Sequence, residues 1–298
     1  MVSRPVTRDD RGFGQPPSKR RGRRGRRWLI ALVVLVLLLV GADFGAAAIA
    51  EHMISQKART QLALSDDPSV TIHGFPFLTQ ALAGDYSHIS VSATGIPVDD
   101  KLRDVAINAD LEDVTAPLSD LANGNTKTIK VGKLTGAVTL KAADLNRESP
   151  LDKVKNLRIE PSTKEYVENG DSSSTEPSPT PTTTTDGQPV DESTAGVRIS
   201  GHLQFAGQDL EIFCFALIEV KNQAITFLPK RLQFGNDKET TVVPQAVQNA
   251  LLPNFKASIG TKDLPMSVTP TGVQVASGSI TIKGEANDVS FSEVSAKK

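Results

Sequence analysis

The longest hydrophobic run of the chain lies near its N-terminus, from Trp28 to Ala50. No charged side chain stands between Trp28 and Ala42, and Leu, Val and Ile occupy every face of the helix that this run would form. A soluble helix buries only one stripe, so this pattern is typical of a membrane-spanning helix. The 23 residues of the run would extend roughly 34 Å, which is enough to cross the hydrocarbon core of a bilayer.

Two interpretations of this run are open, a retained anchor and a cleaved signal peptide. Ala48-Ile49-Ala50 offers a small-x-small cleavage site before Glu51. The run is long for a signal peptide, however, and apolar residues continue beyond it at helical spacing: Ala46, Ile49, Ala50, Met53, Ile54, Ala58 and Leu62. We therefore expect a transmembrane signal-anchor over residues 28–50, continued by a helix that ends near Leu64.

The basic residues before the run predict its orientation. Residues 19–27 contain seven cationic side chains in nine positions, which should keep residues 1–27 in the cytoplasm and place residues 51–298 outside the cytoplasmic membrane. Residues 1–27 carry ten Lys or Arg and two Asp, a net charge of +8, so the remainder of this −1 chain carries −9. An acidic exported domain argues against a nucleic-acid partner.

Beyond the helix the pattern changes to short strands in which apolar and polar residues alternate. Ile89, Val91 and Ala93 share one face, and so do Val105, Ile107, Ala109 and Leu111. This alternation predicts an antiparallel sheet with one wetted face. Residues 240–252 fit a second long helix, and Pro229 marks an edge strand or a break. The sequence thus predicts the α+β class, with two long helices and one large curved antiparallel sheet.

Residues 168–194 interrupt this pattern with six acids, four prolines, no base and a run of four threonines. Such a composition cannot bury an apolar core, so we expect an extended disordered insertion.

Two stretches carry unusually apolar surfaces. The segment from Gly74 to Gly84 reads as a short helix, with Pro76 in its first turn and Gly84 at its C-terminal stop. Residues 210–220 form a strand that is apolar on both faces, which implies cover on both sides by protein, ligand or membrane. If both stretches face one cavity, its lining consists of Phe75, Phe77, Leu78, Leu82, Phe213, Phe215 and Leu217. A solid core plug is the alternative for the first stretch.

The sequence contains no motif that indicates catalysis. There is no nucleophile elbow, no His-Glu-x-x-His, no phosphate-binding glycine loop and no Cys-x-x-Cys, and the four histidines lack metal-ligand spacing. Cys214 stands among apolar neighbours, which favours a core residue over a nucleophile. His73 could contact a polar headgroup, and Asp99-Asp100 fits an exposed turn. We expect no catalytic residues, no metal and no cofactor.

Several of these stretches resemble the LmeA family of bacterial envelope proteins. The most specific motif is Gly74-Phe-Pro-Phe-Leu, within the longer stretch from Val70 to Tyr86. Weaker matches are Val197-Arg-Ile-Ser-Gly, Leu228-Pro, Leu264-Pro with Gly272-Val-Gln-Val, and the anchor followed by Asp43-Phe-Gly. The resemblance covers about residues 40–160 and 195–291, and the insertion at 168–194 departs from the family's usual pattern.

The resemblance implies a phospholipid-binding protein of the actinobacterial cell envelope. It also implies a tubular lipid-binding fold like that of bactericidal permeability-increasing protein, in which a strongly curved antiparallel sheet wraps a long helix and leaves an apolar tunnel. The expected partners are a phospholipid or phosphoinositide-type lipid and the cytoplasmic membrane. A role in the biogenesis of lipomannan-type lipoglycans, with envelope glycosyltransferases as candidate partners, is implied in the same way. The alternatives are a scaffold for such glycosyltransferases that binds no lipid, and an unrecognised hydrolase.

Overall fold

The computed structural model describes residues 23–98, 102–147, 151–170, 192–205, 208–221, 223–235, 240–260 and 268–290. The chain forms two compact units, residues 1–43 and residues 44–298. Helix α1 (Arg23–Leu62) begins in the first unit, where the large apolar side chains from Trp28 to Leu39 are exposed. The helix is long and apolar enough to cross a membrane. It ends at Leu62, close to the end expected from the sequence.

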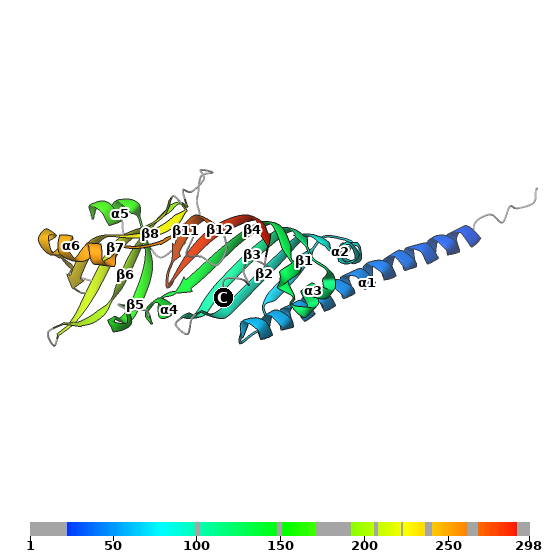
Figure 1. Cartoon of the computed structure of the whole chain (residues 1–298), viewed down its shortest axis with the longest axis horizontal. Coiled ribbons are helices and arrows are strands. Elements are labelled where there is room, and N and C mark those ends of the chain that lie inside the picture. The colour runs from blue at the N-terminus through cyan, green and yellow to red at the C-terminus, as the bar shows by residue number, and fades with distance from the viewer. Residues whose placement is uncertain are drawn as a thin grey trace, which may run out of the picture. The chain divides into compact units, whose positions relative to one another are not determined.

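The second unit contains a first sheet of six antiparallel strands (Figure 1). Their order is β1-β2-β3-β4-β12-β11, so the last two strands of the chain lie beside β4. The bounds are β1 (Ser69–His73), β2 (Asp85–Val98), β3 (Leu102–Thr115), β4 (Lys130–Lys141), β11 (Thr269–Ala276) and β12 (Ser279–Ser290). Short helices α2 (Phe77–Ala83), α3 (Leu118–Asn123) and η1 (Thr126–Thr128) connect the early strands.

A second antiparallel sheet is built from the middle of the chain, in the order β10-β8-β7-β6-β5, with β9 also paired to β8. Its strands are β5 (Lys155–Ser162), β6 (Thr194–Phe205), β7 (Gln208–Lys221), β8 (Ala224–Gly235), β9 (Thr240–Val242) and β10 (Ala257–Gly260). The remaining helices are α4 (Ala142–Leu145), η2 (Leu151–Lys153), α5 (Lys164–Asn169), α6 (Gln245–Leu251) and η3 (Leu252–Phe255). The predicted α+β class is confirmed, but the strands are divided between two open sheets instead of one platform.

The C-terminal half of α1 packs against the first sheet. Ala50 is buried there, with Ala46, Ala47 and Ile54 beside it, among side chains of β1 to β4 that include Val70, Ile72, Tyr86 and Val131. Small alanine side chains allow the helix to approach the sheet closely. The Glu51 carboxylate also accepts a hydrogen bond from the Ile72 backbone N–H at 2.7 Å, which occupies a donor on the edge strand β1.

The inward-facing side chains of the first sheet change phase at one level. Along a regular strand, residues two apart share a face. Here the buried or half-buried core residues on either side of this level are three apart in four neighbouring strands: Tyr86 and Ile89, Leu111 and Val114, Val131 and Leu134, Ala286 and Val289. Asp113 and Asp288 lie at this level with φ values of 52° and 50°. Their left-handed backbone allows the side chains above and below to face the same core.

A second core joins the two sheets. Ile159, Val197 and Ile218 of the second sheet pack with Val273 and Ile280 of the β11–β12 hairpin. The backbone N–H of Gly278 donates to the carbonyl of Ile159 at 2.8 Å, and that of Val273 donates to Glu192 at 2.8 Å. The hairpin therefore belongs to the first sheet by strand pairing and fastens it to the second.

The predicted helix over 240–252 is only partly correct. Thr240–Val242 pair with β8 as strand β9, and α6 covers only Gln245–Leu251, after Pro244 at its N-cap. The buried Gln248 side chain accepts from the Leu232 N–H at 3.2 Å and donates to the Val243 carbonyl at 2.7 Å. Pro229 lies inside β8, which is not an edge strand because β7 pairs on one side and β10 and β9 pair on the other. The predicted break takes the form of a register shift against β7, where Phe215 pairs with Arg231 and Ala216 with Pro229.

The predicted insertion falls mostly outside the described residues. Its ends do not: Glu168 and Asn169 close helix α5, and Thr194 begins β6. Residues 171–191 lie outside the described residues, so the disorder expected there stays a prediction.

Candidate functional site

The short helix α2 presents apolar side chains to the surface. Its start at Phe77 and its stop at Gly84, which has a φ of +75°, agree with the signals of Pro76 and Gly84 in the sequence. Phe77 is only 2% exposed and packs in the core with α1, but Leu78 and Leu82, one turn apart, are 42% and 89% exposed. Phe77 thus fixes α2 to the sheet while the leucines face outward.

Two phenylalanines near α2 in the sequence or in space are exposed as well. Phe75, 59% exposed, stacks on Phe44 of α1, with ring centroids 6.0 Å apart and planes at 23°. We call Phe44, Phe75, Leu78 and Leu82 the α2 patch. Large apolar side chains that cluster on a surface mark interaction sites more often than scattered ones do.

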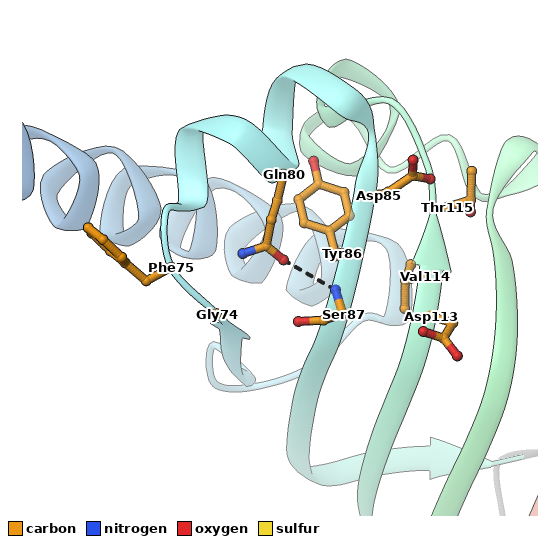
Figure 2. A pocket seen from close by; sticks show the side chains of 9 residues that line it. All are labelled: Gly74, Phe75, Gln80, Asp85, Tyr86, Ser87, Asp113, Val114 and Thr115. Carbon is orange, nitrogen blue, oxygen red and sulfur yellow. Dashed lines mark hydrogen bonds between the residues drawn. The ribbon is translucent and has the colours of Figure 1, made fainter.

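A pocket of about 500 Å³ lies next to Phe75 (Figure 2). The residues that line it are Gly74, Phe75, Gln80, Asp85, Tyr86, Ser87, Asp113, Val114 and Thr115. The Gln80 side chain, which lines the pocket, accepts a hydrogen bond from the Ser87 N–H at 3.2 Å and donates one to the His73 carbonyl at 3.3 Å. These two hydrogen bonds hold α2 over β1 and β2. Its lining combines two carboxylates, hydroxyls and an amide with the apolar side chains of Phe75 and Val114, so the pocket offers both hydrogen-bonding groups and apolar surface.

Tyr86 belongs to the core beneath this pocket. It is almost fully buried, and its hydroxyl has no hydrogen-bond partner in the described part of the chain. Burial raises the pKa of the phenol, so Tyr86 stays neutral.

The other predicted residues, Phe213, Phe215 and Leu217, lie in a separate buried cluster on β7, under helix α5. The Arg231 guanidinium lies over the rings of Phe215 and Tyr166, at 4.6 Å and 5.0 Å, and donates to the Tyr166 carbonyl at 3.1 Å. Desolvation lowers the pKa of Arg231, and its interaction and hydrogen bond with Tyr166 partly offset this lowering. The Arg231 cation therefore stacks on two aromatic rings and connects β8 to α5 at this cluster.

The structure therefore does not bring the two predicted sets together. Phe77 lies in the core of the first sheet, the β7 residues lie in the cluster of the second sheet, and Phe75, Leu78 and Leu82 are at the surface. The predicted cover on both faces of the β7 strand is confirmed, and protein supplies it: Ala216 and Ile218 pack in the core between the sheets, on the face opposite Phe215. Contact of these residues with lipid stays a prediction.

A polar network that sequence reasoning missed lies on the outer face of the first sheet. His73 and His88 are paired across β1 and β2, and their rings stack with centroids 4.3 Å apart. The Ser90 hydroxyl donates to the Asp110 carboxylate at 2.8 Å, and a ring nitrogen of His88 lies 3.0 Å from the same oxygen. Hydrogen bonds from Ser90 and then His88 lower the pKa of Asp110. His73 and His88 become neighbours only because β1 and β2 pair in this register. The register cannot be deduced from the sequence of the two strands.

The Ser90 hydroxyl, which donates to Asp110, also lies 3.3 Å from the His88 Nε2. His73, predicted as a headgroup contact, has a ring nitrogen 2.9 Å from the Ser90 hydroxyl. Burial raises the pKa of Cys214 to about 12, which leaves the thiol unreactive. No group of His, Cys, Asp and Glu in the described ranges could hold a metal ion, and Asp99-Asp100 lie outside them.

Comparison with known proteins gives one match. The model of a family described as LmeA-like phospholipid-binding matches residues 41–285, which include α2, its pocket and all the strands of the first sheet except the end of β12. No curated protein and no solved structure matches the chain.

Proposed function

Because the chain belongs to the LmeA-like phospholipid-binding family, we propose that it is a membrane-anchored phospholipid carrier of the cell envelope. The family match over residues 41–285 is the observation that carries this proposal. The family is a lipid-binding family and not an enzyme family. We accordingly propose that the protein moves or presents a lipid without changing it.

The α2 patch and its pocket suit a phospholipid physically. An acyl chain gains about 0.8 kcal/mol for each methylene that leaves water, so apolar side chains such as Phe75 and Leu78 favour its binding. The pocket beside Phe75 offers hydrogen-bonding groups to the headgroup. A long chain with a weakly selected headgroup is the ligand that this combination fits, and the β7 residues Phe213, Phe215 and Leu217 remain a second candidate lining.

We further propose a place for the protein in the cell. Helix α1 is compatible with a membrane anchor. The basic N-terminal residues favour a cytoplasmic N-terminus and an exported second unit. A phospholipid or phosphoinositide-type lipid delivered there would serve the synthesis of envelope lipids or lipoglycans, beside the glycosyltransferases that extend them. Support for this finer role comes only from the family resemblance.

Native mass spectrometry of the full chain, released gently from its own membranes, tests the proposal. We expect a population with one phospholipid bound, and transfer of labelled phospholipid from donor to acceptor vesicles by the purified protein. An empty protein that transfers nothing would favour the scaffold alternative. A lipid whose mass changes during incubation would instead indicate a hydrolase.

A further inference from the structure

The α2 patch is exposed and uncharged. Residues 74–84 contain no charged side chain, and Leu82 is 89% exposed. The interaction of such a surface with a partner must come from apolar burial, since it has no charge to attract one. A lipid bilayer has the matching chemistry, because its apolar acyl chains lie just below the polar headgroups.

The position of the patch along the chain indicates which partner that is. Phe44 follows Ala42, the end of the uncharged run, by two residues of the same helix. Two residues of chain span at most about 7 Å, so the chain connection alone keeps Phe44 near the end of that run. Phe75 stacks on Phe44, and α2 begins two residues later. The chain connection therefore keeps Phe44, and Phe75 stacked on it, close to the outer end of the uncharged run.

We propose that the α2 patch inserts into the surface of the membrane in which α1 is anchored, and that lipid enters the protein there. This inference rests on the proposed function. Leu78 and Leu82 would lie at the boundary of headgroups and acyl chains, as the apolar face of an interfacial helix does. Phe75 belongs to the patch and to the pocket, so a phospholipid that leaves the bilayer along the patch meets the hydrogen-bonding groups of Gln80 and Ser87 next.

The absence of charge within 74–84 has a consequence that can be measured. Basic interfacial helices bind anionic lipid and are released by salt, because their attraction is electrostatic. Insertion of the α2 patch depends on apolar burial instead. We expect it in vesicles of phosphatidylcholine alone, unchanged by added salt.

The test uses the full chain in phosphatidylcholine proteoliposomes, with an environment-sensitive fluorophore on Leu82→Cys. The matched control is Val242→Cys, an apolar residue of β9 that is 53% exposed on the second sheet. The wild-type chain is the labelling blank, because its Cys214 thiol is unreactive. Vesicles contain phosphatidylcholine with a nitroxide either on the headgroup or along the acyl chain, which reports the depth of the probe.

We expect the Leu82 probe to emit at shorter wavelength and to be quenched by both nitroxides, at low and high salt, while the Val242 probe behaves as in water. A Leu82 probe that stays in water overturns the inference. So does a shielded probe that neither nitroxide quenches, since protein would then cover the patch. Insertion that salt abolishes would also overturn it, because charge would be the cause.

A second variant connects insertion to lipid entry. Leu78→Asp with Leu82→Asp changes two exposed side chains, so the melting temperature should hold, while lipid uptake from vesicles slows at least roughly tenfold. Unchanged uptake would overturn the entry route. A wild-type chain that carries phospholipid while its Leu82 probe stays in water refutes the docking alone, whereas a chain that docks but never carries phospholipid refutes the proposed function alone.

Discussion

Replacing Phe77 by Ala tests whether α2 is fixed to the fold by a core residue or by a cavity that lipid fills. The ring is 2% exposed and packs in the core cluster of α1 and the first sheet, with Ala50, Ile72 and Tyr86. Removal of a phenylalanine side chain from a packed core costs about 3–5 kcal/mol, which includes the cavity left behind. In a unit of this size that loss lowers the melting temperature by roughly 6–20 °C.

The β-sheet signal in far-ultraviolet circular dichroism can follow this unfolding in the full chain. So can the labelling of the Cys214 thiol, which becomes accessible when the chain unfolds. Trp28, the only tryptophan, lies in the apolar part of α1 and reports little on the sheets. Leu82→Ala is the control on the same helix, and its 89% exposure predicts almost no change. A loss below about 1 kcal/mol for Phe77→Ala would refute the core assignment. It would restore the prediction from the sequence that Phe77 lines a lipid cavity.

Three further predictions follow from single features. Hydrogen bonds lower the pKa of Asp110 below its ordinary 3.8, so its contribution to stability is present above that pH and disappears as the pH falls through the lower folded value. Asp110→Asn should reduce the fall in the free energy of unfolding at acid pH, and the difference should be less than about 1 kcal/mol because Asp110 is exposed. Urea titrations at several pH values measure it. Deletion of 172–190 with a Gly-Ser joint should leave the melting temperature unchanged, whereas deletion of 168–194 should lower it, because Glu168 and Asn169 belong to α5 and Glu192 bonds β11. A chain that starts at Glu51 should be less soluble and less stable than one that starts at Phe44, because it lacks Ala46, Ala47 and Ala50 of the core; equal melting of the two would contradict this.

Local signals in the sequence predicted the elements that depend on local chemistry. Pro76 and Gly84 bound α2 as expected, and the alternation in β2 and β3 predicted strands with one apolar face. The change of phase at Asp113 and Asp288 could not be predicted, because nothing in an aspartate by itself requires a positive φ. These two residues lie at one level only because β3 and β12 both pair with β4.

The length of the helix predicted over 240–252 was overestimated for a related reason. Val243, Ala246 and Val247 have helical spacing, but tertiary pairing with β8 takes Thr240–Val242 into a strand. Among these three, only Val243 is buried. Pairing between distant strands decided this boundary against the local period.

The candidate site shows the same division. Periodicity within the seven residues of α2 does not state which face meets the sheet, so Phe77 and Leu78 looked equivalent in the sequence, although one is core and the other surface. The doubly apolar β7 was recognised correctly as covered on both sides. What covers it depends on α5 and on β11, elements that are far from it in sequence.

The two sheets use their apolar residues differently, and this difference bears on where lipid acts. On β7 the apolar side chains are taken up by the protein itself, with Ile218 against the β11–β12 hairpin and Phe215 under α5 and Arg231. At α2 the opposite holds: Phe77 and Ala81 pack in the core, and Phe75, Leu78 and Leu82 remain in contact with solvent. Keeping three large apolar side chains in water costs free energy that burial against lipid would return. This is why we place the proposed lipid contact at the α2 patch and not at the apolar residues of β7, which are already buried by protein.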